Sequence, residues 1–456
     1  MPINYGRFIQ ISMLPEIQQK EMETLDAGAR FVLKSHGTWL HCGYHLTTSI
    51  VAVPLLCLPY AFRFLGWTGG VVCLVTGALV TFYTYNLLSY VLEHFSQKGQ
   101  RLLRFRDVTL HVLGPKWARF CVGPGQLSLC YCTVIANILL GGICVKTLYK
   151  LLYPHGSIKL IVFVVAYGFV VMILAQLPSF HSLRHINMIS ILLCLIFSAG
   201  SAIGAIYVGF KYNIIKDYSL HGDNTERVFG ALTGVGIVAA ALGNSVIPEI
   251  QATIAPPVTG KMFKGLCLAY GVVMATFFSV AISGYWAFGD QSASILYSNF
   301  LLDNGKVLVP KWLVMMIIIC ALVQLLAVTG VYIQPVNELL EQLFSDPNKK
   351  EFAPRNAIPR FFARSISVII ATTFAGMLPF FGDLMALLGA VGYMPLDFIL
   401  PPILFNKTFN PARNGFIFWF NLAIAVVSSA LALAIAVAST RQIVLDAKTY
   451  KLFANL

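Results

Sequence analysis

The sequence predicts an all-α integral membrane protein with about eleven transmembrane helices. Hydrophobic residues make up 57 % of its 456 positions and charged residues only 11 %, whereas an ordinary soluble domain has about 25 % charged residues. Apolar runs of about 20 residues, the length that crosses a bilayer core of roughly 30 Å, recur along the whole chain. Two of these runs are interrupted in the middle, at matching places in the two halves of the sequence.

The apolar runs account for nearly all of the chain. They lie near residues 41–65, 68–92, 118–149, 159–176, 185–209, 228–254, 262–288, 311–340, 361–381, 383–406 and 414–439. We therefore expect one transporter-sized membrane domain, residues 39–440, between a cytoplasmic tail of residues 1–38 and a short tail of residues 441–456. No loop is long enough to fold as a separate soluble domain.

The interrupted runs are the first and the sixth, so five spans separate equivalent positions. An odd number of spans reverses the orientation of the second half relative to the bilayer. This predicts an inverted five-plus-five repeat, with repeat one at about 39–210, repeat two at about 228–406 and an extra helix at 414–440.

The net charge of +13 does not indicate a nucleic-acid partner, because Lys and Arg follow the expected topology. With the N-terminus inside, roughly 20 of them fall on cytoplasmic segments and roughly 12 on the other face. The lipid bilayer is thus the expected partner, with a cytoplasmic N-terminus and an outside C-terminus. No obligate protein partner is inferred.

The interruption in the first span contains Pro54. Proline breaks the helical hydrogen-bond ladder, and a membrane helix tolerates this where the freed groups are buried in protein or line a cavity. Paired interruptions of this kind point to the binding site of a transporter. If Pro54 begins an outer half-helix, the free N–H groups there suit a carboxylate; a simple proline kink is the alternative. The candidate substrate-binding residues here are Thr48, Ser49, Val51, Ala52, Val53 and Pro54.

The sixth span is interrupted at Leu242, Gly243, Asn244 and Ser245. Gly243 allows the backbone to turn, while Asn244 and Ser245 offer polar groups at about mid-depth. In a membrane span, each of these residue types alone more often serves helix–helix packing. Together, opposite the first interruption, they are predicted to line the substrate.

Three ionisable residues inside the spans are candidates for coupling or gating, because a charge at that depth is costly and is often functional. Asp397, near the centre of the tenth span, is predicted to pair either with a substrate amine or with an internal partner such as a backbone amide. Glu249 is predicted to act in proton coupling or as an inner-gate contact. His45 suits proton transfer, and a hydrogen-bonded structural role is its alternative.

Three further polar residues, Asn137, Gln324 and Tyr332, are weaker candidates for the same cavity, since such residues more often hold helices together. Enzyme motifs are absent from the sequence: a dinucleotide-type glycine pattern at 234–239 lies inside an apolar run with no preceding strand. We therefore expect neither an enzyme nor a metal or cofactor.

Short stretches along the chain resemble the amino acid/auxin permease family, and within it the plant transporters of γ-aminobutyrate (GABA). They include Pro-Glu-Ile-Gln-Ala-Thr at 248–253 and Pro-Leu-Asp-Phe at 395–398. The other matching stretches are 26–29, 41–51, 58–62, 177–184, 283–289, 377–383, 446–447 and 450–453. The similarity covers almost everything from about residue 26 to the end.

The resemblance implies a leucine-transporter-type fold, proton-coupled import of GABA or a related ω-amino acid, and a plasma-membrane location, with a proton gradient as the energy source. Many permeases of the family have Gly-x-Gly in the first break, where this chain has Ala52 and Pro54. A longer zwitterion, with separate sites for its amine and carboxylate, suits that difference. The alternatives are a permease for neutral or basic amino acids or proline, a non-transporting amino-acid sensor, and a vacuolar or other organelle membrane.

Overall fold

The computed structural model describes residues 38–100, 102, 104–176, 183–212, 216–220, 222–254, 258–302, 305–344, 354–378 and 380–449. Most of the predicted N-terminal tail, the stretches 26–29 and 450–453, and most of 177–184 therefore lie outside the described residues. In the described part the chain is mainly helical, with turns, loops and isolated bridge residues such as the pair Leu301 and Val307.

The first span is broken as the sequence predicts. Helix α3 (Trp39–Ile50) begins at the N-cap Thr38, whose side chain accepts a hydrogen bond from the backbone of His41. After the break, the 3₁₀ helix η1 (Val53–Cys57) continues directly into α4 (Leu58–Gln97). Gly66 kinks α4 with a φ of 68°, a conformation that glycine adopts without steric cost. The kink separates the outer half of the first span from the second span.

The third to fifth spans follow in order. Short elements lead into the third span: α5 (Phe105–Val112), α6 (Pro115–Trp117) and the π-helical η2 (Ala118–Val122). The spans themselves are α7 (Gly123–Leu152), α8 (Leu160–Ala175) and α9 (Leu183–Lys211).

The sixth span is also broken. Helix α10 (Asn224–Leu242) is capped at its start by Asp223, and the short helix α11 (Ile247–Ala252) resumes after residues 243–246. Gly243 leaves the helix in an extended conformation, with φ −70° and ψ 146°. The prediction of two broken helices is confirmed.

The remaining elements complete the bundle. They are α12 (Thr259–Phe288), η4 (Gly289–Gln291), η5 (Leu296–Phe300), α13 (Lys311–Phe344), α14 (Pro354–Met377), α15 (Phe381–Leu388), the π-helical η6 (Gly389–Ile399), α16 (Leu400–Phe409) and α17 (Phe416–Thr449). The tenth span is thus three consecutive segments, α15, η6 and α16.

Nine helices among the described residues are long and apolar enough to cross a membrane. One of these, Val53–Gln97, contains the outer half of the first span and the whole second span. Adding the first span, completed by α3, and the shorter apolar helix Leu160–Ala175 gives the eleven spans that the sequence predicts.

Several helix ends differ from the expected boundaries, among them the ends of α13 and α17. Helix α13 runs to Phe344, beyond the predicted 340, and α17 runs to Thr449, through half of the predicted C-terminal tail. In α17 the side chain of Gln442 donates a hydrogen bond of 3.2 Å to Asp446, four residues later. Such i,i+4 pairs stabilise a polar helical turn, which hydropathy alone does not predict.

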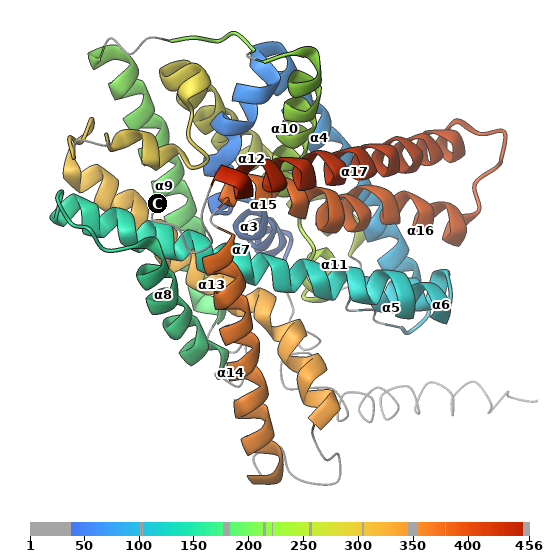
Figure 1. The fold of residues 1–456 in the computed structure, drawn as a ribbon. Coiled ribbons are helices and arrows are strands. Elements are labelled where there is room, and N and C mark those ends of the chain that lie inside the picture. Colours follow the sequence, from blue (N-terminus) through green and yellow to red (C-terminus); the bar gives the residue numbers. More distant parts are fainter. Residues whose placement is uncertain are drawn as a thin grey trace, which may run out of the picture.

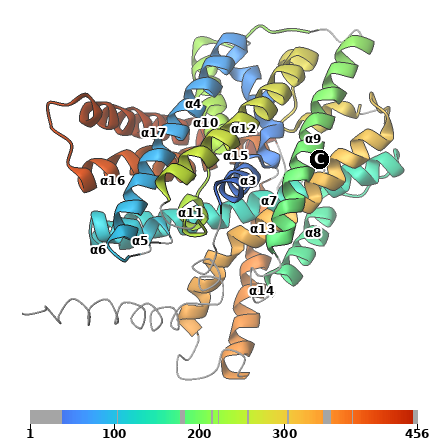
Figure 2. The same ribbon diagram turned by 180° about the vertical axis from the view of Figure 1, so that it is seen from behind.

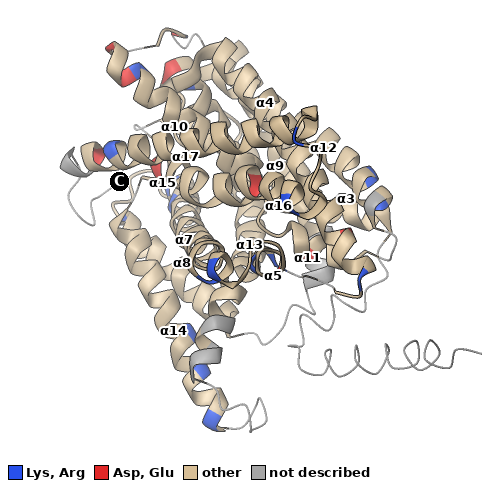
Figure 3. Cartoon of the chain, turned by 90° about the vertical axis from the view of Figure 1, so that its right-hand side faces the viewer, with Lys and Arg blue, Asp and Glu red and all other residues tan. Residues whose placement is uncertain are grey.

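Helix α3 lies at the centre of the bundle in both views (Figures 1 and 2) and packs against α12, α9 and α11. Helices α16 and α17 lie side by side at one edge, and α17 also contacts α10 and η6. Lys, Arg, Asp and Glu occupy only short stretches of the ribbon (Figure 3). Many large hydrophobic side chains are exposed on the described helices, such as Phe169, Trp419 and Leu433, as expected for surfaces that face lipid.

Helices α10 and η6 cross with their backbones in contact. A Cβ atom built on Gly389 would lie 2.0 Å from the carbonyl oxygen of Gly236, and one on Gly236 would lie 2.6 Å from the side chain of Ile435 in α17. Gly236 belongs to the glycine pattern at 234–239, which lies within α10. These glycines therefore serve close helix packing.

Candidate functional site

The first break exposes the carbonyl group of Val51 to side chains from two other helices. Helix α3 ends at Ile50, and Ala52 is extended. The side-chain amide of Gln324 in α13 donates to the Val51 oxygen at 3.0 Å, and the thiol of Cys194 in α9 lies 2.7 Å from the same oxygen. The carbonyl of Val51 has no helical hydrogen-bond donor at the break, so side chains of α13 and α9 supply its hydrogen bonds instead.

Pro54 lies in the first turn of η1, the segment that resumes the helix after this break. Proline there loses no hydrogen bond that the helix needs. Val53 and Leu55 on either side of it are buried. Proline itself has no N–H group, and the N–H of Leu55 donates to the carbonyl of Ala52 at 3.0 Å. A carboxylate site at this helix start stays a prediction.

The sixth break is held by a carboxylate from the tenth span. The backbone N–H of Asn244 donates to Oδ2 of Asp397 at 2.9 Å, and the hydroxyl of Tyr85 donates to the carbonyl of Leu242 at 3.4 Å. Asp397 has no exposed surface, and its other oxygen, Oδ1, is buried and accepts no hydrogen bond from the residues that the structure describes. A buried carboxylate oxygen in this state is able to accept a proton or a cationic group.

One direct hydrogen bond joins the two breaks. The side-chain amide of Asn244 donates to the hydroxyl of Ser49 at 2.7 Å, and that hydroxyl donates to the carbonyl of Leu46 one turn earlier in α3. Asn244 and Ser49 are 195 positions apart in sequence. The fold thus brings the two interrupted segments together at one point.

Three hydroxyl groups meet beside the sixth break. Ser245 lies 3.4 Å from the hydroxyl of Tyr332 in α13, which lies 3.5 Å from the hydroxyl of Tyr393 in η6. All three residues are at least nine-tenths buried. Both distances exceed the usual range for O–H···O bonds, so the hydroxyls are in loose contact.

The structure therefore brings together seven of the residues that the sequence predicts for the site. They are Ser49, Val51, Asn244, Ser245, Gln324, Tyr332 and Asp397, which the contacts above connect to one or both breaks. Ala52, Val53, Leu242 and Gly243 form the backbone of the breaks themselves. The hydroxyl of Thr48 donates to the carbonyl of His45 within α3.

Three other predicted residues lie on neighbouring elements. His45 is half-buried in α3, with its ring centroid 4.3 Å from that of Tyr44. Glu249 is in the first turn of α11, near enough to Cys130 of α7 to interact with it electrostatically. Asn137 is buried in α7, and its Nδ2 has no hydrogen-bond partner among the residues described here. Their roles in binding, coupling or gating stay predictions.

Sequence reasoning missed Tyr393 and Tyr85, which contact the sixth break from the tenth and second spans. A tyrosine in an apolar run has an ordinary place in a membrane helix, so nothing marks it as part of a site. The one available signal is the short spacing between Tyr393 and Asp397, which puts both on one face of a helix.

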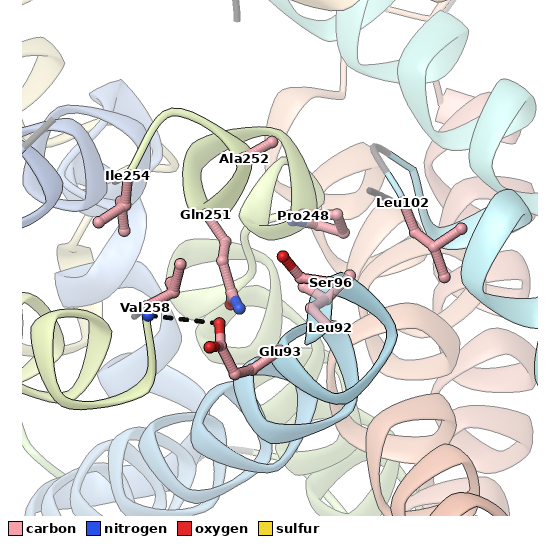
Figure 4. A pocket seen from close by; sticks show the side chains of 9 residues that line it. All are labelled: Leu92, Glu93, Ser96, Leu102, Pro248, Gln251, Ala252, Ile254 and Val258. Atoms are coloured by element: carbon pink, nitrogen blue, oxygen red, sulfur yellow. Dashed lines mark hydrogen bonds between the residues drawn. The ribbon is translucent and has the colours of Figure 1, made fainter. Parts of the chain in front are cut away.

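A further missed residue is Glu93, near the end of α4. Its carboxylate accepts hydrogen bonds from the backbone N–H of Val258 at 3.3 Å and from Gln97 at 3.4 Å. In Figure 4 its side chain points toward Gln251, which donates to the carbonyl of Ser89 at 3.0 Å. Glu93, Gln251 and Val258 line a small pocket. Their hydrogen bonds connect α11 and the start of α12 to α4. Glu93 lies just beyond the predicted span, where a charged residue is unremarkable.

Replacing Glu93 by Ala should lower the stability of the purified protein by about 1–3 kcal/mol, because the buried N–H of Val258 would lose its acceptor. Glu93→Gln keeps an acceptor oxygen in place and should therefore lower the stability less. Thermal unfolding in detergent compares the two variants with the unmodified protein. Equal melting temperatures for all three would show that this contact does not hold α12.

Comparison with known proteins agrees with this geometry. A family model described as "Transmembrane amino acid transporter protein" matches residues 35–445. GABA transporter 1 of Arabidopsis thaliana is 54 % identical over 441 residues, which cover 96 % of this chain and 98 % of that protein. Lysine histidine transporter-like 6 of the same plant is 30 % identical over 424 residues, covering 91 % and 93 %.

Among solved structures, that of MhsT in complex with L-phenylalanine superposes with a TM-score of 0.52 at 9 % identity, covering 89 % of this chain and 99 % of that one. This likeness, together with the two broken helices, shows a fold of the leucine-transporter type. The chain belongs to the transmembrane amino acid transporter family. The family consists of transporters, so the protein is not an enzyme.

Proposed function

We propose that the protein is a proton-coupled symporter that imports GABA and related ω-amino acids across the plasma membrane by alternating access. The observation that carries the proposal is Asp397: a buried carboxylate, one oxygen of which accepts a hydrogen bond from the sixth break, while the other has no hydrogen-bond partner in the described part of the chain. The similarity to GABA transporter 1 over almost the whole chain supports the substrate.

An ω-amino acid has its amine and carboxylate several bonds apart, so it needs two separate poles. The carboxylate binds at the half-helix that starts with Val53 and Pro54, because the N-terminal end of a helix dipole favours a negative charge. The amine binds near Oδ1 of Asp397 or the carbonyl groups of the sixth break. This arrangement supports a substrate longer than an α-amino acid.

Proton coupling and topology complete the proposal. Asp397, Glu249 and His45 are the candidate proton carriers, and the proton gradient is the energy source. The N-terminus is cytoplasmic and the C-terminus outside, with repeats at about 39–210 and 228–406. During transport the first and sixth spans rock against a scaffold formed by the other helices. The protein works without a cofactor or an obligate protein partner.

The test is uptake of radiolabelled GABA into a transport-deficient host, at acidic and neutral outside pH, with and without a protonophore. We expect uptake that rises in acid, collapses with the protonophore and persists when sodium is replaced. A second candidate, a permease for basic or neutral amino acids, is favoured by the 30 % identity to Lysine histidine transporter-like 6. A competition panel separates the two. No uptake of any amino acid by protein present at the surface would favour a sensor.

Replacing Gln324 by Leu should raise the KM for uptake about tenfold, because the carbonyl of Val51 would lose its stronger donor and the first break would lose its fixed geometry. Cys194→Ala is the matched control: it removes the other group at the same oxygen, and a thiol is only a weak donor. The concentration dependence of uptake gives both KM values. If the KM of Gln324→Leu equals that of the unmodified protein, Gln324 does not contribute to substrate binding.

A further inference from the structure

Tyr393 and Asp397 reach the same break from one segment. Both belong to the π-helical η6, four residues apart, and both are buried. Asp397 accepts the backbone N–H of Asn244, while Tyr393 lies against the preceding residue, Gly243. Short π-helical segments often occur at functional sites because they change which side chains share a face.

The ring of Tyr393 covers the backbone of Gly243 very closely. A Cβ atom built on Gly243 would lie 2.2 Å from Cδ1 of Tyr393 and 2.4 Å from Cγ. Real Cβ atoms essentially never approach so near, so only glycine at position 243 admits this ring. The ring therefore fills the space beside the sixth break on the side from which Asp397 approaches.

The hydroxyl groups contribute less than the ring. The contact of Tyr393 with Tyr332 is 3.5 Å long, and that of Tyr332 with Ser245 is 3.4 Å. Because these contacts are weak, removing the hydroxyl of Tyr393 should leave the ring in place. Removing the ring, in contrast, opens a space beside Gly243.

We propose that Tyr393 is a specificity-determining residue, whose ring excludes substrates that carry a substituent on the carbon bonded to the amine. The inference rests on the proposed function, in which the amine binds near Asp397. An amine held there places its own carbon beside the ring of Tyr393. In an ω-amino acid this carbon is an unbranched CH₂ group, whereas in an α-amino acid it carries both a side chain and the carboxylate.

The experiment compares inhibition of GABA uptake by two methylated analogues. In 4-aminopentanoate the extra methyl group is on the amine-bearing carbon, and in 4-amino-2-methylbutanoate it is next to the carboxylate. The distance between amine and carboxylate is that of GABA in both. The variants are Tyr393→Ala, Tyr393→Leu, which keeps more of the core volume, and Tyr393→Phe, which keeps the ring.

We expect Tyr393→Ala and Tyr393→Leu to improve the relative inhibition by 4-aminopentanoate about tenfold, which is the size of effect that one methyl group has in an apolar pocket. The relative inhibition by 4-amino-2-methylbutanoate should stay unchanged, and Tyr393→Phe, which keeps the ring, should retain the discrimination against 4-aminopentanoate. A general folding defect would reduce uptake without changing this ratio between analogues.

Each outcome decides between the proposals. If the unmodified protein takes up GABA and the surface-expressed Ala or Leu variant retains its discrimination against 4-aminopentanoate, the role of Tyr393 is wrong and the proposed function stands. If the unmodified protein takes up no GABA, the proposed function and this inference fail together. If the relative inhibition by both analogues improves equally, the ring limits the overall size of the site and does not act on the amine-bearing carbon alone, so the proposed role is wrong.

Discussion

Replacing Asp397 by Asn should reduce GABA uptake about 100-fold or more while the protein still reaches the surface. The Asn side chain keeps an oxygen that accepts the N–H of Asn244, so the sixth break keeps its shape. What is lost is the negative charge that would bind the amine or the coupling proton. Removing one partner of a buried charge pair typically costs about 3–5 kcal/mol, which corresponds to a loss of this size.

Asp397→Ala separates the two roles of this residue. It removes the acceptor as well as the charge, so both stability and uptake should fall, whereas Asp397→Asn should spare stability. Uptake and surface labelling are measured on the same cells at acidic and neutral pH. An Asp397→Asn variant with unchanged affinity and unchanged pH dependence would show that Asp397 neither binds the amine nor carries the proton.

Replacing Gly389 by Ala should strongly reduce the amount of folded protein. The new Cβ would lie 2.0 Å from the carbonyl oxygen of Gly236, and a backbone atom in the middle of a helix cannot move aside as a side chain can. Overpacking of a tight interior costs about 1–3 kcal/mol or more, and the upper end applies here. Thermal unfolding of the purified protein and its recovery in the monodisperse fraction measure the effect.

Gly271→Ala is the matched control for this substitution. Gly271 is also in the middle of a helix, α12, but no neighbouring atom lies within 4 Å of its ideal Cβ position. Alanine there should be neutral or stabilise the helix by about 0.5–1 kcal/mol. Similar losses in both variants would mean that the close crossing of α10 and η6 is not what limits stability.

The overall architecture was largely predictable because it depends on hydropathy, which is a local property. Long apolar runs, and the Pro and Gly-Asn interruptions within them, indicate spans and breaks without knowledge of neighbouring helices. The ends of α13 and α17 were predicted too early, because polar turns continue these helices beyond their apolar parts. The kink at Gly66 was not predicted either, since it depends on one backbone angle.

The site was predictable only in part, for a different reason. The sequence indicates that Asp397 is costly to bury, but its contact with the backbone of Asn244 depends on how two helices cross. The same holds for Tyr393, whose ring position follows from the absence of a side chain at Gly243. The hydrogen bond between Asn244 and Ser49 joins the first and sixth spans, each of which contains one break. The sequence indicates the breaks, but this contact depends on how the two spans pack.

The packing of α17 has a consequence for how the protein is made. Ile435 of α17 is fully buried with Ala239 of α10 and Met394 of η6, in a cluster separate from the main core. The ribosome delivers α17 to the membrane long after α10, so the face of α10 around Ala239 lacks its α17 partner during the synthesis of every helix between them. The sixth and tenth helices therefore reach their final packing only late in membrane insertion, and substitutions in α17 should be detected by quality control as assembly defects.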